Sequence, residues 1–127
     1  MQLVKVETKK APAAIGPYSQ AVKAGGVLYC SGQVPLIPET GELVAGGIET
    51  QTKQSLDNLQ QVLKEAGIDF NSVVKTTIYL TNLGDFSVVN EIYAGYCGKV
   101  APARATVQVA ALPKGALVEI DAIAYIG

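Results

Sequence analysis

The spacing of apolar residues along the chain predicts two amphipathic helices. Between Ile48 and Ala66, apolar or small side chains recur every three or four positions and polar side chains occupy the other faces. Gly67 follows where a glycine commonly ends a helix. A second helix is expected over roughly residues 86 to 97, with Asp85 placed to cap its first turn.

Shorter alternating or β-branched segments predict strands. The expected order of elements is β-β-β-β-α-β-α-β-β, without a linker or repeat between them. This order predicts an α+β fold in which a mixed β-sheet carries two main helices on one face, formed by a single domain over residues 1–127. The expected strands are residues 3–7, a pair around Gly25-Gly26 within 21–35, a tight hairpin at 36–44, and residues 72–82, 103–109 and 116–126.

The last two strands carry the charged residues that first suggest a site. Arg104 is the only arginine among the ten basic residues, and it shares a strand face with Thr106 and Gln108. On the other face of the same strand, the alternate Ala and Val residues form an apolar row, which is expected to lie under the helices. Because segment 110–115 is short enough for a hairpin, we expect the two strands to pair antiparallel with Arg104 and Glu119 on one side of the sheet.

Two interpretations of Arg104 and Glu119 remain open on these residues alone. A structural salt bridge at a surface contributes only ~0–1 kcal/mol and is common. Alternatively, the planar guanidinium binds a carboxylate through two parallel hydrogen bonds, which a lysine cannot do as well. The second interpretation predicts a site for a small carboxylic acid.

Composition narrows the class of protein. Hydrophobic residues make up 49% and charged residues 17% of the 127 residues, and this sparse charge suggests that other subunits cover part of the apolar surface. A net charge of −1 without a basic cluster disfavours nucleic acid as a partner. The lack of a long apolar run, the polar N-terminus and two widely separated cysteines favour a cytoplasmic protein without membrane contact.

Five segments in this order resemble the RidA (YjgF) family over nearly the whole chain. The most specific one is a Pro-x-Arg strand that leads through a Leu-Pro turn to a strand bearing Val-Glu-Ile, PARATVQVAALPKGALVEIDAIA at 102–124. The other four are IGPYSQAV (15–22), LYCSGQVPLIPETGELV (28–44), TKQSLDNLQQVLKEAG (52–67) and TTIYLTNLGDFSVVNEIY (76–93).

The resemblance implies a chorismate-mutase-like subunit that assembles as a homotrimer, with three sites in clefts between subunits. It further implies hydrolysis of reactive 2-imino acids, such as 2-iminobutanoate and 2-iminopropanoate, to 2-oxo acids and ammonia without a cofactor or metal. The absence of histidine from the sequence agrees with a site that lacks a metal.

Site roles also follow from the resemblance. Arg104 matches the arginine that clamps the substrate carboxylate, and Glu119 matches the acid that orients the attacking water. Thr106 departs from the family pattern, because many members have a cysteine there; we expect deaminase activity to survive this change. The residues that match the lining of the same cleft are Tyr18, Ser31, Gly32 and Asn90.

Three other functions compete with this interpretation. The same clefts could hold a 2-oxo acid as a signal without catalysis, since a carboxylate clamp serves binding as well as turnover. A chorismate-mutase-type isomerase is disfavoured because a dianionic substrate calls for several cationic groups and the chain has one arginine. A ribonuclease or translation inhibitor is disfavoured by the lack of histidine and the acidic pI of about 5.3.

Overall fold

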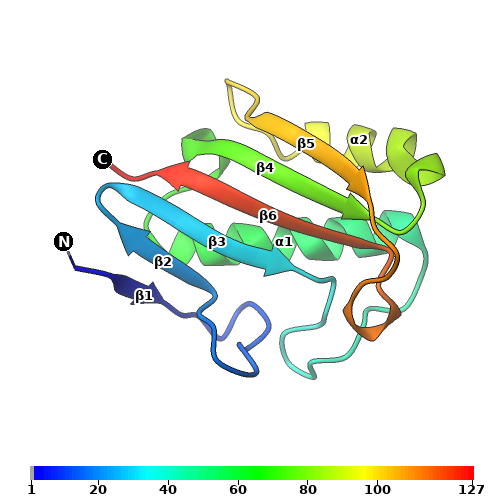
Figure 1. Ribbon diagram of the computed structural model, residues 1–127, viewed down its shortest axis with the longest axis horizontal. Coiled ribbons are helices and arrows are strands. Elements are labelled where there is room, and N and C mark those ends of the chain that lie inside the picture. Colours follow the sequence, from blue (N-terminus) through cyan, green and yellow to red (C-terminus); the bar gives the residue numbers. More distant parts are fainter. Residues whose placement is uncertain (1) are drawn as a thin grey trace.

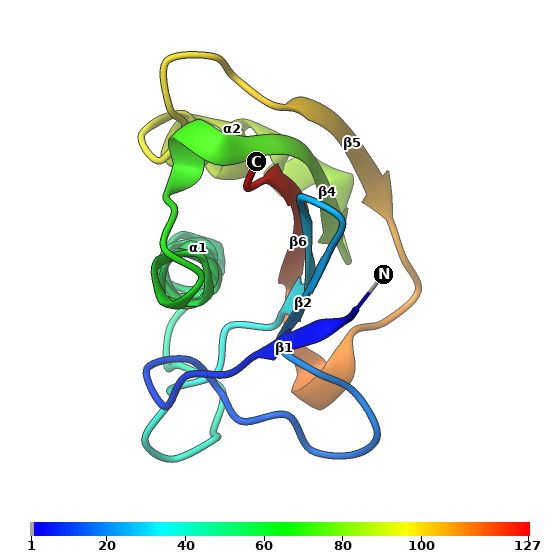
Figure 2. The same ribbon diagram turned by 90° about the vertical axis from the view of Figure 1, so that its left-hand side faces the viewer.

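A six-stranded β-sheet covered on one face by two helices forms the framework of the protein (Figures 1 and 2). The computed structural model describes residues 2–127. The α+β fold with both helices on one face is confirmed, and the expected hairpin at 36–44 is reduced to a single bridge between Leu36 and Leu43. The strands are β1 (Val4–Val6), β2 (Ala21–Ala24), β3 (Val27–Gln33), β4 (Val73–Leu80), β5 (Ala103–Gln108) and β6 (Val118–Tyr125), and the helices are α1 (Ile48–Glu65) and α2 (Phe86–Ala94).

The two helices end for different reasons. Gly67 adopts φ +83° directly after the last turn of α1, which confirms it as the residue that ends this helix. α2 ends at Ala94, three residues earlier than expected. The expectation that Asp85 caps α2 is wrong, because a 3₁₀ turn, Leu83–Asp85, runs directly into the helix and the Asp85 side chain makes no capping hydrogen bond. Within residues 2–127, neither helix is long and apolar enough to cross a membrane.

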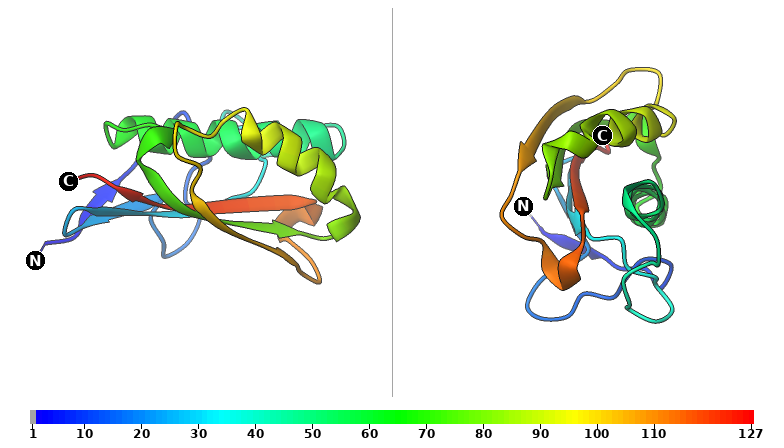
Figure 3. Two further views of the ribbon diagram at one scale, coloured as in Figure 1. Left: turned by 90° about the horizontal axis from the view of Figure 1, so that it is seen from above. Right: turned by 90° about the vertical axis from the view of Figure 1, so that its right-hand side faces the viewer.

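The core lies between α1 and the middle of the sheet. The apolar face of α1 is buried, as its helical spacing predicts, except at its first residue, Ile48, which is partly buried. Views along the sheet and from above it show that both helices lie on the same face (Figures 2 and 3). α1 runs across this face, and α2 lies near the edge of the sheet that β5 forms. The hydrophobic core residues without exposed surface are Leu56, Leu59, Val62 and Leu63 of α1, Val89 of α2, Ile78 and Leu80 of β4, Val118, Ile120 and Ala124 of β6, and Leu28 of β3.

The order of strands in the sheet is β1-β2-β3-β6-β4-β5. β6 pairs antiparallel with β3 on one side and with β4 on the other, so neither of its edges is left for β5. β5 therefore pairs with β4, in parallel, and α2 forms the crossover between them. The expected hairpin between the last two strands is wrong for this reason.

This topology places Arg104 and Glu119 on opposite faces of the sheet. Arg104 is paired with Thr76, which is buried under the helices, whereas Glu119 is paired with Tyr79 on the face that no helix covers. The expectation that both residues share one side is therefore wrong. The apolar row of β5, expected under the helices, lies instead on the uncovered face, where Val107 is 40% exposed.

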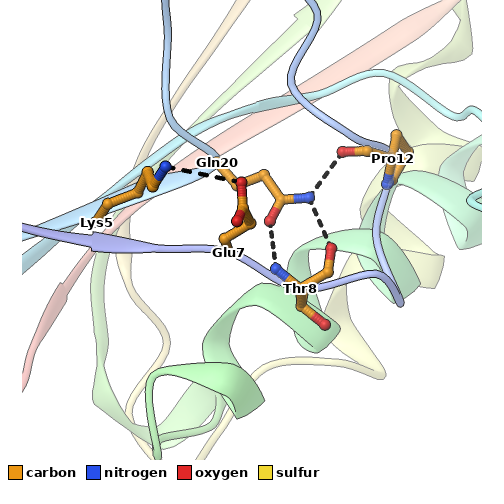
Figure 4. Close-up of polar contacts among 5 residues, drawn as sticks. All are labelled: Lys5, Glu7, Thr8, Pro12 and Gln20. Atoms are coloured by element: carbon orange, nitrogen blue, oxygen red, sulfur yellow. Dashed lines mark hydrogen bonds and ion pairs between the residues drawn. The ribbon is translucent and has the colours of Figure 1, made fainter.

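A buried glutamine fixes the segment that follows β1 (Figure 4). Gln20 Oε1 accepts a hydrogen bond from the Thr8 backbone N at 2.7 Å, and Gln20 Nε2 donates to the carbonyl oxygens of Thr8 at 3.0 Å and Pro12 at 2.8 Å. The nearby Lys5–Glu7 ion pair is exposed and spans 3.9 Å, so it contributes little. The glutamine amide thus holds residues 8–12 against the start of β2.

We expect Gln20→Glu to lower the free energy of unfolding by about 2–4 kcal/mol, because it replaces the donating amide with an oxygen that faces two carbonyl groups in a buried place. Urea unfolding followed by circular dichroism measures the change. The control is Gln60→Glu at an exposed position of α1, expected to stay within about 0.5 kcal/mol of the wild type. Equal stability of both variants would show that the Gln20 contacts do not hold the segment.

Candidate active site

A cleft of about 530 Å³ opens at the end of β3, and we call it the Glu119 cleft. It brings together four residues that the sequence singled out, Tyr18, Ser31, Gly32 and Glu119. Its other walls come from the segment after β1, from the residues after β3 and from the turn before β6. These additional lining residues are Pro12, Ala13, Ile15, Gln20, Gln33, Val34, Leu36, Pro113 and Lys114.

Gly32 makes room for the carboxylate of Glu119. A Cβ atom at position 32 would overlap Glu119 Oε2, so any side chain there forces the carboxylate to move. The pairing of β3 with β6 is irregular between Cys30 and Gln33, which lets the backbone at Gly32 bend beside Glu119. A glycine is therefore needed at position 32 because the Glu119 carboxylate lies close to its backbone, and not because the backbone adopts an unusual angle.

Ser31 holds the wall of the cleft that carries Tyr18. Its hydroxyl donates a hydrogen bond to the Ser19 carbonyl oxygen at 2.6 Å, and its backbone N donates to the Gln20 carbonyl oxygen at 2.9 Å. The hydroxyl oxygen retains capacity to accept a hydrogen bond. Tyr18 is 52% exposed and presents its side chain to the cleft opening.

Burial raises the pKa of the Glu119 carboxyl above its usual value, and the negative charge of Asp121 raises this pKa further. Asp121 is fixed on the same face of β6: its carboxylate accepts hydrogen bonds from the Thr77 backbone N at 3.2 Å and from the Tyr79 hydroxyl at 2.9 Å. Glu119 is consequently easier to protonate than an ordinary glutamate. A group of this kind can both take up and release a proton.

Cys30 precedes the site serine in β3 but takes no part in this chemistry. Its side chain is buried, and burial together with the charge of Asp121 raises the pKa of the thiol to about 12. The thiolate needed for nucleophilic attack is therefore disfavoured. Cys30 is therefore a buried packing residue.

Arg104 lies in a separate arrangement against α2, which we call the Arg104 cradle and define by Phe86, Asn90, Tyr93 and Arg104. The guanidinium carbon lies 5.2 Å from the ring centroid of Phe86 and 5.3 Å from that of Tyr93. Arg104 Nη1 donates a hydrogen bond to Asn90 Oδ1 at 2.7 Å. Two cation–π contacts and one hydrogen bond thus orient the guanidinium, and its remaining N–H groups are available to an anion.

Sequence reasoning identified Asn90 but missed the two aromatic rings. Phe86, Asn90 and Tyr93 recur at positions i, i+4 and i+7, so one face of α2 presents all three to Arg104. The Tyr93 hydroxyl is fixed by Thr76 Oγ1 at 2.6 Å beneath the helix. This spacing is visible in the sequence, but on its own it resembles an ordinary core stripe, and only the position of β5 next to β4 gives it a cationic partner.

Thr106 lies two residues beyond Arg104 on the same face of β5. Its Oγ1 atom is buried, and among residues 2–127 it has no hydrogen-bond partner. Buried hydroxyl groups are usually paired, so Thr106 Oγ1 is an exception among the described residues.

Within residues 2–127, the residues that the sequence singled out therefore fall into two separate groups. The Glu119 cleft gathers Tyr18, Ser31, Gly32 and Glu119, and the Arg104 cradle gathers Asn90 and Arg104 with Thr106 beside them. β4 separates the two strands that carry Arg104 and Glu119, which corresponds to ~10 Å across the sheet in addition to the change of face. Residues 2–127 hold no group of three or more cysteine, aspartate or glutamate side chains placed to bind a metal ion.

Comparison with known proteins shows close relatives over the whole chain. The endoribonuclease L-PSP family model matches residues 8–126. The 2-iminobutanoate/2-iminopropanoate deaminase of Mus musculus is 57% identical over 122 residues, which covers 96% of this chain and 90% of the mouse protein. The deaminase of the same name from Homo sapiens is 52% identical over 122 residues, covering 96% of this chain and 89% of the human protein.

A solved structure agrees with these relatives. The crystal structure of YyfA from Yersinia pestis, described as a protein of unknown function of the conserved Rid protein family, superposes with a TM-score of 0.96 at 55% identity and covers 98% of this chain and 100% of that chain. The resemblance inferred from the five sequence segments is thereby confirmed. The chain belongs to the endoribonuclease L-PSP family, which is the RidA (YjgF) family.

Proposed function

We propose that this protein hydrolyses reactive 2-imino acids, such as 2-iminobutanoate and 2-iminopropanoate, to 2-oxo acids and ammonia. The observation that carries the proposal is the Glu119 carboxyl, whose pKa is raised inside a cleft, together with a preoriented arginine on the same chain. Two relatives that are 52% and 57% identical bear the name of this activity. Acid–base catalysis and a carboxylate clamp are the two functions that the reaction requires.

The proposed reaction begins with binding of the substrate carboxylate by Arg104 through two charge-assisted hydrogen bonds. Glu119 accepts a proton from a water molecule as its oxygen attacks the imine carbon, and the C=N double bond becomes a C–N single bond. That proton then passes to the nitrogen, which gives a carbinolamine. Glu119 next transfers the hydroxyl proton of the carbinolamine to the same nitrogen, the C–N bond breaks, and ammonia leaves as the carbonyl forms. Tyr18 and Ser31 line the same cleft as Glu119, which supports a role for their hydroxyl groups as hydrogen-bond partners of the reacting groups.

A complete site requires that the Arg104 cradle of one subunit meets the Glu119 cleft of another. The uncovered face of the sheet exposes Tyr29, Val107 and Tyr125 at 51%, 40% and 63%, which is the kind of apolar surface that subunits bury. The buried Thr106 Oγ1 atom has no hydrogen-bond partner among residues 2–127, and a neighbouring subunit would supply one. We therefore propose a homotrimer with three intersubunit sites, acting in the cytoplasm on small imino acids and without a cofactor.

Binding of a 2-oxo acid without turnover is the second candidate function, because the Arg104 cradle serves either purpose. The family description names an endoribonuclease. The net charge of −1 and the absence of histidine give no support to RNA cleavage by this chain.

We expect Arg104→Ala to lower kcat/KM for imine hydrolysis on the order of 100-fold, about 2.7 kcal/mol in transition-state stabilisation, because the substrate carboxylate loses its bidentate partner. The assay generates 2-iminobutanoate in solution and follows its trapping by semicarbazide. Arg104→Lys keeps the charge but not the planar fork, and should fall between the wild type and Arg104→Ala. An inert wild type that still binds a 2-oxo acid would show that the protein is a sensor and not this enzyme.

A mixing experiment tests whether sites are shared between subunits. Arg104→Ala and Glu119→Gln should each retain only a small fraction of the wild-type activity, yet trimers assembled from an equal mixture after unfolding and refolding should recover about one quarter of the wild-type sites. These sites combine the intact Arg104 of one chain with the intact Glu119 of another. The control is the same mixture without subunit exchange. Recovery that never exceeds this control would place both residues in a site within one chain.

We expect Glu119→Gln to raise stability at neutral pH. A carboxyl whose pKa is raised by folding binds its proton more tightly in the folded state, so its contribution to stability is full below the usual pKa and is lost as pH rises through the raised pKa. The stability gain of the variant should therefore shrink at acidic pH. Thermal unfolding across the pH range measures it, with the exposed Glu39→Gln as control. A gain that does not depend on pH would contradict the assignment.

A further inference from the structure

Lys114 occupies an unusual place in the turn that leads into β6. Among residues 2–127 it is the only residue other than glycine with a positive φ, at +58°, in the 3₁₀ turn Pro113–Gly115. A left-handed backbone is unfavourable for a side chain with a Cβ atom and favours glycine. The next residue, Gly115, also has a positive φ of +72°, so the turn carries a lysine where a second glycine would relieve strain.

The side chain of Lys114 makes a long-range contact that a glycine would lack. Lys114 Nζ donates a hydrogen bond to the Gly41 carbonyl oxygen at 2.7 Å, across 73 positions of sequence. Gly41 lies in the 36–44 segment, so the ammonium group joins this segment to the turn between β5 and β6. Both segments lie at the same end of the sheet, beyond the end of β3 (Figure 1).

The two segments joined in this way both line the Glu119 cleft. Pro113 and Lys114 line it from the turn, and Leu36 lines it from the 36–44 segment. On its other side, the 36–44 segment is held by α1, because Asn58 Nδ2 donates to the Leu36 carbonyl oxygen at 2.9 Å. Lys114 therefore supplies the second of two polar attachments that hold this wall of the cleft.

We propose that Lys114 is a positioning residue for the reaction at Glu119: its ammonium group holds the 36–44 segment and the β5–β6 turn at the spacing that the cleft needs for its substrate. This inference rests on the proposed function. Lys114 is also the only cationic side chain that lines the described cleft, where it stands with Glu119. The strain at φ +58° is then retained because the side chain is needed at this position.

Three variants test this role. Lys114→Gly removes the attachment and relieves the strained backbone, so it should raise the melting temperature by a few degrees and raise KM several-fold with a smaller change in kcat. Lys114→Met keeps the strain and the bulk but cannot donate to Gly41, so it should raise KM similarly without the gain in melting temperature. Lys114→Arg keeps a long cationic donor and should restore KM to near the wild-type value. Lys99→Met removes a lysine outside the cleft and controls for net charge.

A measurement independent of turnover separates this inference from the proposed function. Amide hydrogen exchange in residues 36–44 should speed up in Lys114→Gly and Lys114→Met but not in Lys114→Arg or Lys99→Met. An inactive wild type with this exchange pattern would overturn the deaminase function and leave the attachment standing. A Lys114→Gly variant that is more stable and has wild-type KM would overturn the positioning role, as would unchanged exchange in the 36–44 segment.

Discussion

The pairing of β6 between β3 and β4 is the constraint on which the rest of the structure depends. Because both edges of β6 are occupied, β5 cannot pair with β6, and it joins the sheet beyond β4. α2 then has to cross from β4 to β5, and its Phe86, Asn90 and Tyr93 come to lie over the strand that carries Arg104. The cradle of the arginine is thus a consequence of strand order.

The same strand order keeps the two charged site residues from neutralising each other. A salt bridge between Arg104 and Glu119 would lower the pKa of the carboxyl and would occupy the guanidinium. With the two on opposite faces, burial and Asp121 raise the pKa of Glu119. Among residues 2–127, Arg104 is paired only with the neutral amide of Asn90 and with aromatic rings. Each of the two groups therefore keeps its own chemistry, which is an easily protonated carboxyl in the Glu119 cleft and an oriented guanidinium in the Arg104 cradle.

Side-chain contacts to loop carbonyl groups give the Glu119 cleft its shape. Gln20 holds the segment after β1, Asn58 and Lys114 hold the segment after β3, and Ser55 of α1 donates a hydrogen bond to the Gln33 carbonyl oxygen at 2.6 Å. These attachments satisfy backbone groups that lack partners in the sheet. A small chain can thereby build defined walls from segments that have almost no regular structure of their own.

The sequence by itself determined most of the helices and strands and the identity of the family. The tertiary structure decided which strands pair and which face of the sheet each side chain occupies. Helical spacing and Gly67 predicted α1, and the motifs around Tyr18, Ser31, Gly32, Arg104 and Glu119 indicated the RidA (YjgF) family from the order of residues alone. A helical period and a turn residue are local properties, because they act within a few positions of the chain.

Only the tertiary structure decided which strand β5 pairs with and which face Arg104 occupies. Strand alternation shows that Arg104 and Thr106 share a face, but it does not say whether that face meets the helices. The small apolar row of β5 and the arginine face were both compatible with burial, and the choice depended on α2 and β4, which are distant partners. The partner of a strand and the face that a side chain occupies both depend on residues far away in the sequence. Contacts such as those of Arg104 with Tyr93 and of Lys114 with Gly41 therefore exist only once the whole sheet has assembled.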